Sequence, residues 1–200
     1  MNPLNQTIVL ASNNKGKIRE INQILAPLQK DVIAIKEFTD EEALEDGLSF
    51  VENAIKKARF ACKVSGLPAI ADDSGIEVDA LNGKPGIYSA RFAGDSASDE
   101  DNLNKLLEAM KDVTAESRSA RFQCIMVYMR HELDPTPVIC QGTWEGSITS
   151  QPQGENGFGY DPVFWVKEDN CSAAELDSER KNALSHRGKA LRQLLEKLSA

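Results

Sequence analysis

The chain has 200 residues, enough for one sizeable domain or two small lobes, and its composition of 41% hydrophobic and 27% charged residues is ordinary for a globular protein. No apolar run approaches the length of a membrane span, and the N-terminus lacks a basic segment followed by a long apolar core. We therefore expect neither membrane association nor secretion. The formal net charge of −8 argues against a nucleic-acid polymer as partner, because such binding needs a basic face. A small anionic ligand held by a few local cations is still compatible with this charge.

The four cysteines, Cys62, Cys124, Cys140 and Cys171, are widely spaced and form no Cys-x-x-Cys pair. This spacing gives little support to a zinc site or to thioredoxin-like redox chemistry. Three of them lie in apolar or strand-like surroundings, as small core residues do. We predict a reducing, cytoplasmic setting.

Segments of strand and helix character alternate along the chain. The predicted strands cover residues 6–12, 31–35, the segment from Pro68 to the Asp72–Asp73 pair, 120–130, 137–146 and 163–166. The predicted helices cover residues 15–28, the segment between Ser49 and Gly66, 98–110, and the chain from about Ser185 onward. Alternation predicts an α/β fold, and a hairpin connection at residues 131–136 makes the sheet mixed rather than purely parallel.

The segment of residues 12–17, Ser-Asn-Asn-Lys-Gly-Lys, joins the first strand to the first helix. Small polar residues and glycine at such a junction expose backbone N–H groups, which suits an anion. Lys15 and Lys17 stand where the helix dipole disfavours cations, and a bound phosphate would reverse that penalty. His186 and Arg187 crowd the start of the last helix in the same way, which favours a shared anionic ligand. The alternative is a polar turn with solvated lysines, and the segment does not match the P-loop pattern.

The helix that Ser49 opens with a capping box has a polar face and an apolar face. The polar face consists of Glu52, Lys56, Arg59 and Lys63. Asn53 and Lys57 fall inside the edge of the apolar face. A lysine there needs a counter-charge or access to a cleft, unless it extends past the core to water.

The loop of residues 155–162 holds two glycines, two aromatic residues and two acids, Glu155 and Asp161. Glycines beside an aromatic ring permit the close approach that a base-stacking platform needs. The alternative is a tight turn in which Phe158 and Tyr160 fill a core.

Asp72 and Asp73 are adjacent at the predicted end of a strand. Because successive side chains of a strand point to opposite faces, we do not expect the two to chelate one ion together. One, Asp73, would face a site, while the other, Asp72, fixes a turn through Ser74 or Gly75 or supports the residues that line the site. Mg²⁺ needs only one or two carboxylates besides waters and phosphate oxygens. A nearby acidic loop offers a second carboxylate from Glu41, Glu42, Glu45 or Asp46. The alternative is an Asx turn at the strand end.

Six segments in this order resemble the inosine/xanthosine triphosphate pyrophosphatase family, whose members remove deaminated purine nucleotides. They are residues 12–17, 45–58, 68–75, 85–92, 157–162 and 185–191. The likeness runs from Thr7 to Leu198, and one departure is Asn13, where many members carry glycine.

The resemblance implies a single domain over residues 1–200, with a long mixed sheet flanked by helices and two lobes around a central nucleotide-binding cleft. It implies Mg²⁺-dependent hydrolysis of ITP, dITP and XTP to the monophosphate and pyrophosphate, which would keep such bases out of DNA and RNA. It also implies a homodimer.

The resemblance also assigns roles by position. Asp73 becomes the general base and a metal ligand, Glu45 the other metal ligand, and Lys17 and Lys57 neutralise charge on the phosphates. The further substrate-binding residues implied are Ser12, Asn13, Asn14, Lys15, Gly16, Ser74, Phe158, Gly159, Tyr160, Asp161, Lys181, His186 and Arg187.

These roles are chemically consistent. By the same resemblance, Lys181, His186 and Arg187 contact the purine edge. Lys and Arg side chains only donate hydrogen bonds, so they pair with a 6-oxo group and find no acceptor in the 6-amino group of adenine. Guanine also has a 6-oxo group, so these donors alone do not exclude GTP.

Two other functions stay open from the sequence: a nucleotide-binding protein without catalysis, and a phosphatase that cleaves the terminal phosphate.

Overall fold

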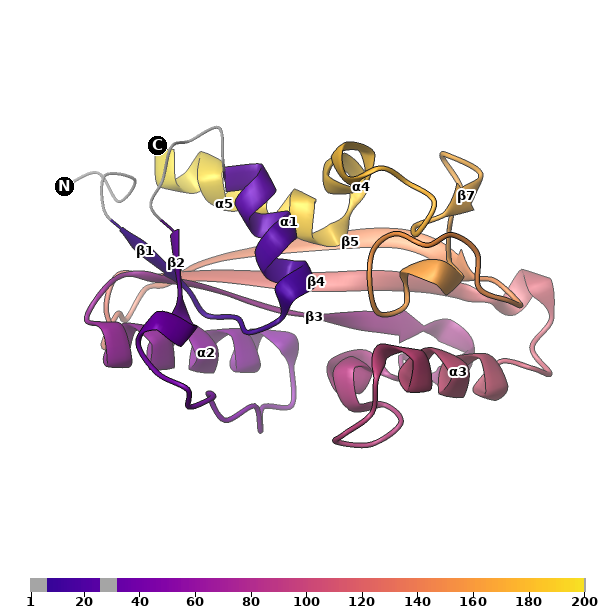
Figure 1. Cartoon of the computed structure of the whole chain (residues 1–200), viewed down its shortest axis with the longest axis horizontal. Helices are drawn as coiled ribbons and strands as arrows, with labels where there is room; N and C mark the ends of the chain where they lie inside the picture. Colours follow the sequence, from indigo (N-terminus) through magenta and orange to yellow (C-terminus); the bar gives the residue numbers. More distant parts are fainter. Residues whose placement is uncertain (1–6, 26–31, 200) are drawn as a thin grey trace. The chain divides into compact units, whose positions relative to one another are not determined.

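The computed structural model describes residues 7–25 and 32–199. Within these residues, one seven-stranded sheet has the order β2-β1-β3-β4-β5-β6-β7 (Figure 1). Its strands are β1 (Ile8–Leu10), β2 (Val32–Ala34), β3 (Ala69–Val78), β4 (Ser119–Met129), β5 (Val138–Ile148), β6 (Phe164–Val166) and β7 (Cys171–Ser172). Strand β1 is parallel to β2 and β3, whereas β6 is antiparallel to β5 and β7. The predicted α/β fold with a mixed sheet is therefore confirmed.

Five α-helices lie in the described part of the chain. They are α1 (Lys15–Leu25), α2 (Phe50–Ser65), α3 (Asp99–Ala109), α4 (Ser178–Leu184) and α5 (His186–Ser199). The predicted ends of α2 are confirmed: Ser49 accepts a hydrogen bond from the backbone of Glu52, and Gly66 stops the helix with a left-handed φ of 68°. One contact of the predicted capping box is different. In such a box the Glu52 carboxylate accepts the backbone N–H of Ser49. Here it accepts the backbone N–H of Leu48 and the hydroxyl of Ser49.

Strand β3 does not end at the aspartate pair. It continues through Ser74 and Gly75 to Val78, because Ile76 and Val78 are fully buried and extend the apolar alternation. The alternative of an Asx turn is therefore wrong, and so is the expectation that one aspartate fixes a turn.

The end of the chain also differs from the prediction. Helix α4, which Asp177 caps through the N–H of Arg180, was not predicted, and Ser185 separates it from α5 in an extended conformation. Strand β7 was also missed, since it has only two residues. The predicted helix residues 26–28 lie outside the described residues, as do the outermost residues, 6 and 31, of two predicted strands.

The chain divides into two compact units. Unit 1 comprises Met1–Asp73, Cys124–Gly142 and His186–Ala200, and unit 2 comprises Ser74–Gln123 and Thr143–Ser185.

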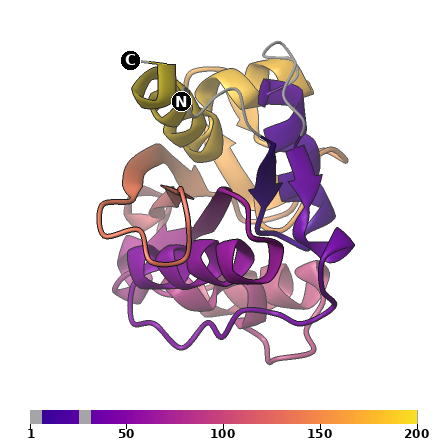
Figure 2. The same ribbon diagram turned by 90° about the vertical axis from the view of Figure 1, so that its left-hand side faces the viewer.

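In unit 1, helices cover both faces of the strands. Helices α1 and α5 pack against each other on one face, and α2 lies on the other (Figures 1 and 2). The sequence produces this arrangement through strict alternation, since Leu10 and Ile70 face α1 and α5 while Val9 and Ala71 face α2. The polar ends of these strands are consequently held between two packed layers.

In unit 2, α3 packs through Leu103 and Leu106 on an aromatic core. The ring centroids of Phe122 and Trp144 lie 4.6 and 5.1 Å from that of Phe164. Such rings bury a large apolar area in a small volume. This core supports the loop that carries Phe158.

The cysteines of the described chain are free, and Cys62, Cys124 and Cys140 are buried, as predicted for core residues. No helix in residues 7–25 and 32–199 is long and apolar enough to cross a membrane.

Candidate active site

The predicted anion-binding segment leads from β1 into α1. Asn14 caps the helix by accepting the N–H of Lys17 at 3.0 Å, and the hydroxyl of Ser12 accepts the N–H of Asn14 at 3.3 Å. The amide of Asn13 donates to Glu42 at 3.1 Å, which ties the segment to the acidic loop. Side-chain oxygens thus already accept hydrogen bonds from two of the backbone N–H groups that we expected to bind an anion. The groups of this segment that stay available to a ligand are the exposed side chains of Asn13 and Lys15 and the Lys17 ammonium.

Asp72 and Asp73 have different partners. The Lys17 ammonium of α1 lies 3.2 Å from Asp72 Oδ2, whereas the Lys57 ammonium of α2 donates to Asp73 Oδ1 at 2.7 Å. Since α1 and α2 cover opposite faces of unit 1, the expectation that the two carboxylates point apart is confirmed.

Lys57 lies between two carboxylates. Its ammonium is 2.7 Å from Asp73 Oδ1 and 3.5 Å from Glu45 Oε2, and its side chain is only 12% exposed. The alternative of a lysine extended to water is therefore wrong. Of the four acidic-loop candidates, only Glu45 pairs with Lys57, and Asp46 pairs instead with Lys56.

The acidic loop is anchored on the start of α2. The backbone N–H of Gly47 donates to Asn53 Oδ1 at 2.8 Å, and a Cβ on Gly47 would lie 2.5 Å from that same oxygen. The buried Asn53 at the edge of the apolar face thus has a structural purpose. It fixes the loop end so that Glu45 meets Lys57.

The two aspartates have opposite pKa shifts. Burial raises the pKa of Asp73, and Lys57 and Lys17 offset this only in part. Burial also opposes ionisation of Asp72, but Lys17 and Arg187 outweigh it and lower the pKa of that carboxyl. Neighbouring carboxyls whose pKa values are pushed apart are typical of acid–base sites. Asp73 is the stronger base of the two.

Arg187 is 2% exposed and belongs to a buried ion-pair network. Its Nε and Nη2 lie 3.3 and 3.2 Å from Asp72 Oδ2, and its Nη1 donates to Glu20 of α1. Arg187 thus pairs with two carboxylates of the chain itself, so its place at the start of the last helix does not by itself indicate an external anion. Sequence reasoning missed Glu20, although an acid beside the apolar residue Ile21 was a usable signal.

His186 begins α5 and is 5% exposed. Strand β5 approaches it closely at Gly142, where a Cβ would lie 2.0 Å from the carbonyl oxygen of His186. Only glycine permits this packing of α5 on β5, which fixes the first turn of the helix.

In unit 2, the loop around Phe158 is built on Asp161. Its Oδ2 accepts the N–H of Phe158 at 2.8 Å and the ammonium of Lys181 at 2.6 Å. That ammonium also lies 4.9 Å from the centroid of the Phe158 ring. Tyr160 is buried and donates to the carbonyl of Ser89 at 2.8 Å, as the core-filling alternative predicted. Phe158 is only partly buried, so it does not fill a core as Tyr160 does.

The structure thus collects the predicted residues into two groups, each within one unit. Unit 1 holds Ser12, Asn13, Asn14, Lys15, Gly16, Lys17, Glu45, Lys57, Asp73, His186 and Arg187. Unit 2 holds Ser74, Phe158, Gly159, Tyr160, Asp161 and Lys181. Ser74 follows Asp73 directly in β3, with a partly exposed side chain.

The carboxylate pair around Lys57 fits a small hard cation. No set of three or more His, Cys, Asp or Glu side chains in the described residues is arranged to hold a metal. Mg²⁺ does not require such a set, because waters and phosphate oxygens complete its coordination. Glu45 and Asp73 already direct oxygens toward one cation, the Lys57 ammonium.

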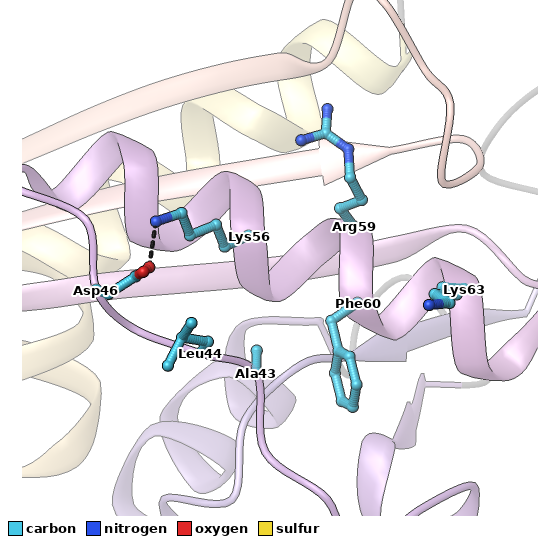
Figure 3. Close-up of a pocket in the computed structure, with 7 residues that line it drawn as sticks. All are labelled: Ala43, Leu44, Asp46, Lys56, Arg59, Phe60 and Lys63. Atoms are coloured by element: carbon cyan, nitrogen blue, oxygen red, sulfur yellow. Dashed lines mark hydrogen bonds and ion pairs between the residues drawn. The ribbon is translucent and has the colours of Figure 1, made fainter.

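A pocket of about 390 Å³ lies on another face of α2 (Figure 3). It is lined by Ala43, Leu44, Asp46, Lys56, Arg59, Phe60 and Lys63. Three of these residues belong to the predicted polar face of the helix, and none of the described lining residues belongs to the predicted site.

The chain has a mixed sheet, and paired lysines and carboxylates cluster where β1 and β3 meet α1 and α2. It is therefore an α/β protein with a polar site on the sheet. More narrowly, the chain belongs to the Ham1 family, whose model matches residues 8–197. The resemblance seen in the sequence is thereby confirmed.

The relatives cover nearly the whole chain. A dITP/XTP pyrophosphatase of Vibrio cholerae is 61% identical over 94% of both chains. A dITP/XTP pyrophosphatase of Escherichia coli O157:H7 is 55% identical over 96% of this chain and 98% of that protein. The solved structure of a HAM1 protein from Coxiella burnetii has a TM-score of 0.89 and 49% identity, and covers 96% of this chain and 98% of that one.

Proposed function

We propose that this protein is a Mg²⁺-dependent nucleoside-triphosphate pyrophosphatase acting on ITP, dITP and XTP. It cleaves the bond between the α- and β-phosphates and releases the monophosphate and pyrophosphate. Family membership and the names of the relatives support this reaction. The observation that carries it is the position of Lys57 between the carboxylates of Asp73 and Glu45.

Asp73 and Glu45 are the proposed ligands of Mg²⁺. When bound, the ion supplies charge neutralisation for the phosphates and makes water more acidic. Lys57 carries its charge on a flexible four-carbon stem, so its ammonium can exchange the two carboxylates for phosphate oxygens.

Asp73 is the proposed general base that takes a proton from the attacking water. Its raised pKa suits this task, because a stronger base takes the proton more readily. Lys17 and Lys57 neutralise the charge that develops on the leaving pyrophosphate. The segment of residues 12–17 and the hydroxyl of Ser74 complete the proposed phosphate contacts.

The residues proposed for the nucleoside lie around Phe158. Its ring stacks on the purine, Gly159 and Tyr160 shape the loop, and Asp161 orients Lys181. Lys181 and His186 are the proposed contacts to the purine edge. A contact from Arg187 would have to coexist with its ion pairs to Asp72 and Glu20. A donor left without an acceptor costs about 1–3 kcal/mol when buried, which disfavours adenine.

The proposed role is removal of deaminated nucleotides from the cytoplasmic pool, by a homodimer that needs neither a nucleic-acid polymer nor a membrane. Free, buried cysteines are compatible with a reducing compartment. Light scattering should give a mass of twice 21.9 kDa, and a mass of one chain would contradict the dimer.

Asp73→Asn tests the proposed catalytic role. The amide keeps the size of the side chain but cannot serve as the base, so pyrophosphate release from ITP with Mg²⁺ should fall by about 100-fold or more. Circular dichroism should show an unchanged fold.

The matched control is Asp46→Asn, which removes an acidic-loop carboxylate that pairs with Lys56 rather than Lys57. It should retain nearly full activity. Normal turnover by Asp73→Asn would remove Asp73 from the mechanism.

A further inference from the structure

Two carboxylates hold the backbone of the loop that carries Phe158. The N–H of Phe158 donates to Asp161 Oδ2 at 2.8 Å, inside the loop. The next N–H, that of Gly159, donates to Asp99 Oδ2 at 2.9 Å, and Asp99 is the first residue of α3. All four residues lie in unit 2. The loop is thus tied to itself at one residue and to a rigid helix at the next.

Other contacts anchor the loop on either side of Gly159: the N–H of Asn156 donates to the carbonyl of Ala174, and the Tyr160 hydroxyl donates to that of Ser89. Gly159 itself is restrained differently. Gly157 and Gly159 have φ values of 77° and 60°, a region that glycine adopts without strain. Apart from Gly159 and its two chain neighbours, no atom of the described residues lies within 4 Å of the position that a Cβ on Gly159 would take, so packing by other segments does not fix this residue. The hydrogen bond to Asp99 therefore restrains a backbone segment with unusual conformational freedom.

Capping of α3 does not require Asp99. Ser98 accepts the N–H of Asp101 at 3.1 Å, and the Asp101 carboxylate accepts the N–H of Ser98 at 2.9 Å, which completes the capping box. The Asp99 carboxylate is left for the tertiary contact. Glu100 bears the same charge in the same turn, and its side chain makes no hydrogen bond within the described part of the chain.

We propose that Asp99 is a positioning residue for purine recognition: it fixes Gly159 and thereby the placement of the Phe158 ring relative to Lys181. This inference rests on the proposed function. Asp161 binds both the Phe158 backbone and the Lys181 ammonium, so ring and donor share one support. A purine that stacks on the ring and offers its 6-oxo group to the donor needs both at a fixed separation. Asp99 acts on that geometry and not on the proton transfer proposed for Asp73.

The test compares Asp99→Ala, Asp99→Asn and Glu100→Ala by steady-state kinetics with ITP and ATP. Asp99→Ala should raise KM for ITP about five- to tenfold, the scale of one lost hydrogen bond, with kcat within about twofold. The ratio of kcat/KM for ITP over ATP should fall by a similar factor. Asp99→Asn keeps an acceptor oxygen and should stay near the wild type. Glu100→Ala removes the same charge from the same helix turn and should change neither value.

A second measurement is independent of turnover. Amide hydrogen exchange at Gly159, followed in the protein without nucleotide, should accelerate in Asp99→Ala and remain unchanged in Glu100→Ala. Equal KM, selectivity and exchange in these two variants would overturn the inference. So would an Asp99→Asn variant as impaired as Asp99→Ala, since charge alone would then explain the effect. Wild-type protein that releases no pyrophosphate from ITP would remove the proposed function, and the exchange result would still decide the role of Asp99 in the loop.

Discussion

Asp72 and Asp73 are neighbours in β3, yet their surroundings differ. Asp72 is fully enclosed with two cations, Lys17 and Arg187, which hold it ionised. Asp73 has a raised pKa and pairs directly with Lys57. The pleat of the strand causes this difference, because it sends one carboxylate toward α1 and α5 and the other toward α2. A one-residue shift of the strand would exchange their environments.

Replacing Lys57 by methionine tests the electrostatics of Asp73. The Lys57 ammonium favours the carboxylate form, so its removal should raise the pKa of Asp73 still further. A base must be deprotonated, so the acidic limb of the kcat/KM profile for ITP should move to higher pH. The overall rate should also fall by about tenfold or more, because a phosphate-neutralising charge is lost.

Lys56→Met is the control for this experiment. Lys56 is adjacent in sequence but pairs with the exposed Asp46, so the limb should not move. A limb that shifts to lower pH in Lys57→Met, or that stays in place, would contradict the role given to this ion pair.

Local sequence patterns were sufficient to predict some site residues but not others. Helical spacing placed Lys57 on the inward edge of α2, and strand alternation separated Asp72 from Asp73. Glu20 and Asp99 escaped notice because their partners lie far along the chain, on α5 and in the Phe158 loop. From the local sequence alone, an acid in the first turn of a helix is explained by its favourable interaction with the helix dipole. Only the tertiary structure shows that the Asp99 carboxylate binds another segment.

At the scale of elements, β3 shows how tertiary contacts override a turn signal. Asp-Ser-Gly favours a turn in isolation, but Ile76 and Val78 beyond it are buried in the core of unit 2. Burying both side chains outweighs the local preference of Ser74 and Gly75, so the strand stays extended. Helix α4 was missed for a different reason: seven residues are too few for a clear apolar periodicity.

The connection between β4 and β5 depends on one buried acid. Asp134 is 2% exposed and accepts the backbone N–H groups of Arg130 and Thr136, each at 3.0 Å, besides the Arg130 guanidinium. Asp134→Ala leaves these donors without their acceptor and should lower the free energy of unfolding by about 1–3 kcal/mol. Thermal melts at neutral pH would measure this loss, while kcat for ITP should be unchanged.

The same acid gives a pH dependence with a definite sign. Hydrogen bonding to Arg130 lowers the pKa of Asp134 below its usual value of 3.8. A lowered pKa in the folded state stabilises the protein above pH 3.8 and loses that contribution as the pH falls further. The difference in stability between wild type and Asp134→Ala should therefore shrink on acidification. Glu132→Ala in the same connection is the control, and an equal loss of stability in both variants at neutral pH would contradict this account.

At the scale of the whole molecule, net charge is a poor guide to the site. The chain carries −8 overall, yet Lys17, Lys57 and Arg187 gather around β3 in unit 1. Each is matched by a carboxylate of the chain itself. The acidic composition argues against a polymer partner, but it gave no sign of a local cation cluster suited to phosphate.

The sequence predicted the fold class and the family, but not how the chain is divided. Segments 124–142 and 186–200 return to unit 1 after the chain has passed through unit 2. Such returns depend on contacts over more than 100 residues, such as Arg187 with Asp72, and no local pattern encodes them. The order of six motifs identified the family because several weak signals in a fixed order are far more specific than any one.

Product analysis of the wild-type protein tests the central claim most directly. Purified protein is incubated with Mg²⁺ and, in parallel, ITP, XTP, GTP and ATP, and all phosphate-containing products are quantified. We predict one pyrophosphate and one monophosphate per ITP or XTP consumed, at a rate about 100-fold or more above that for ATP. Orthophosphate with inosine diphosphate would instead show cleavage of the terminal phosphate, and binding of ITP without any product would show a nucleotide-binding protein. Either result would contradict the assignment of Asp73, Glu45 and Lys57 to a pyrophosphatase.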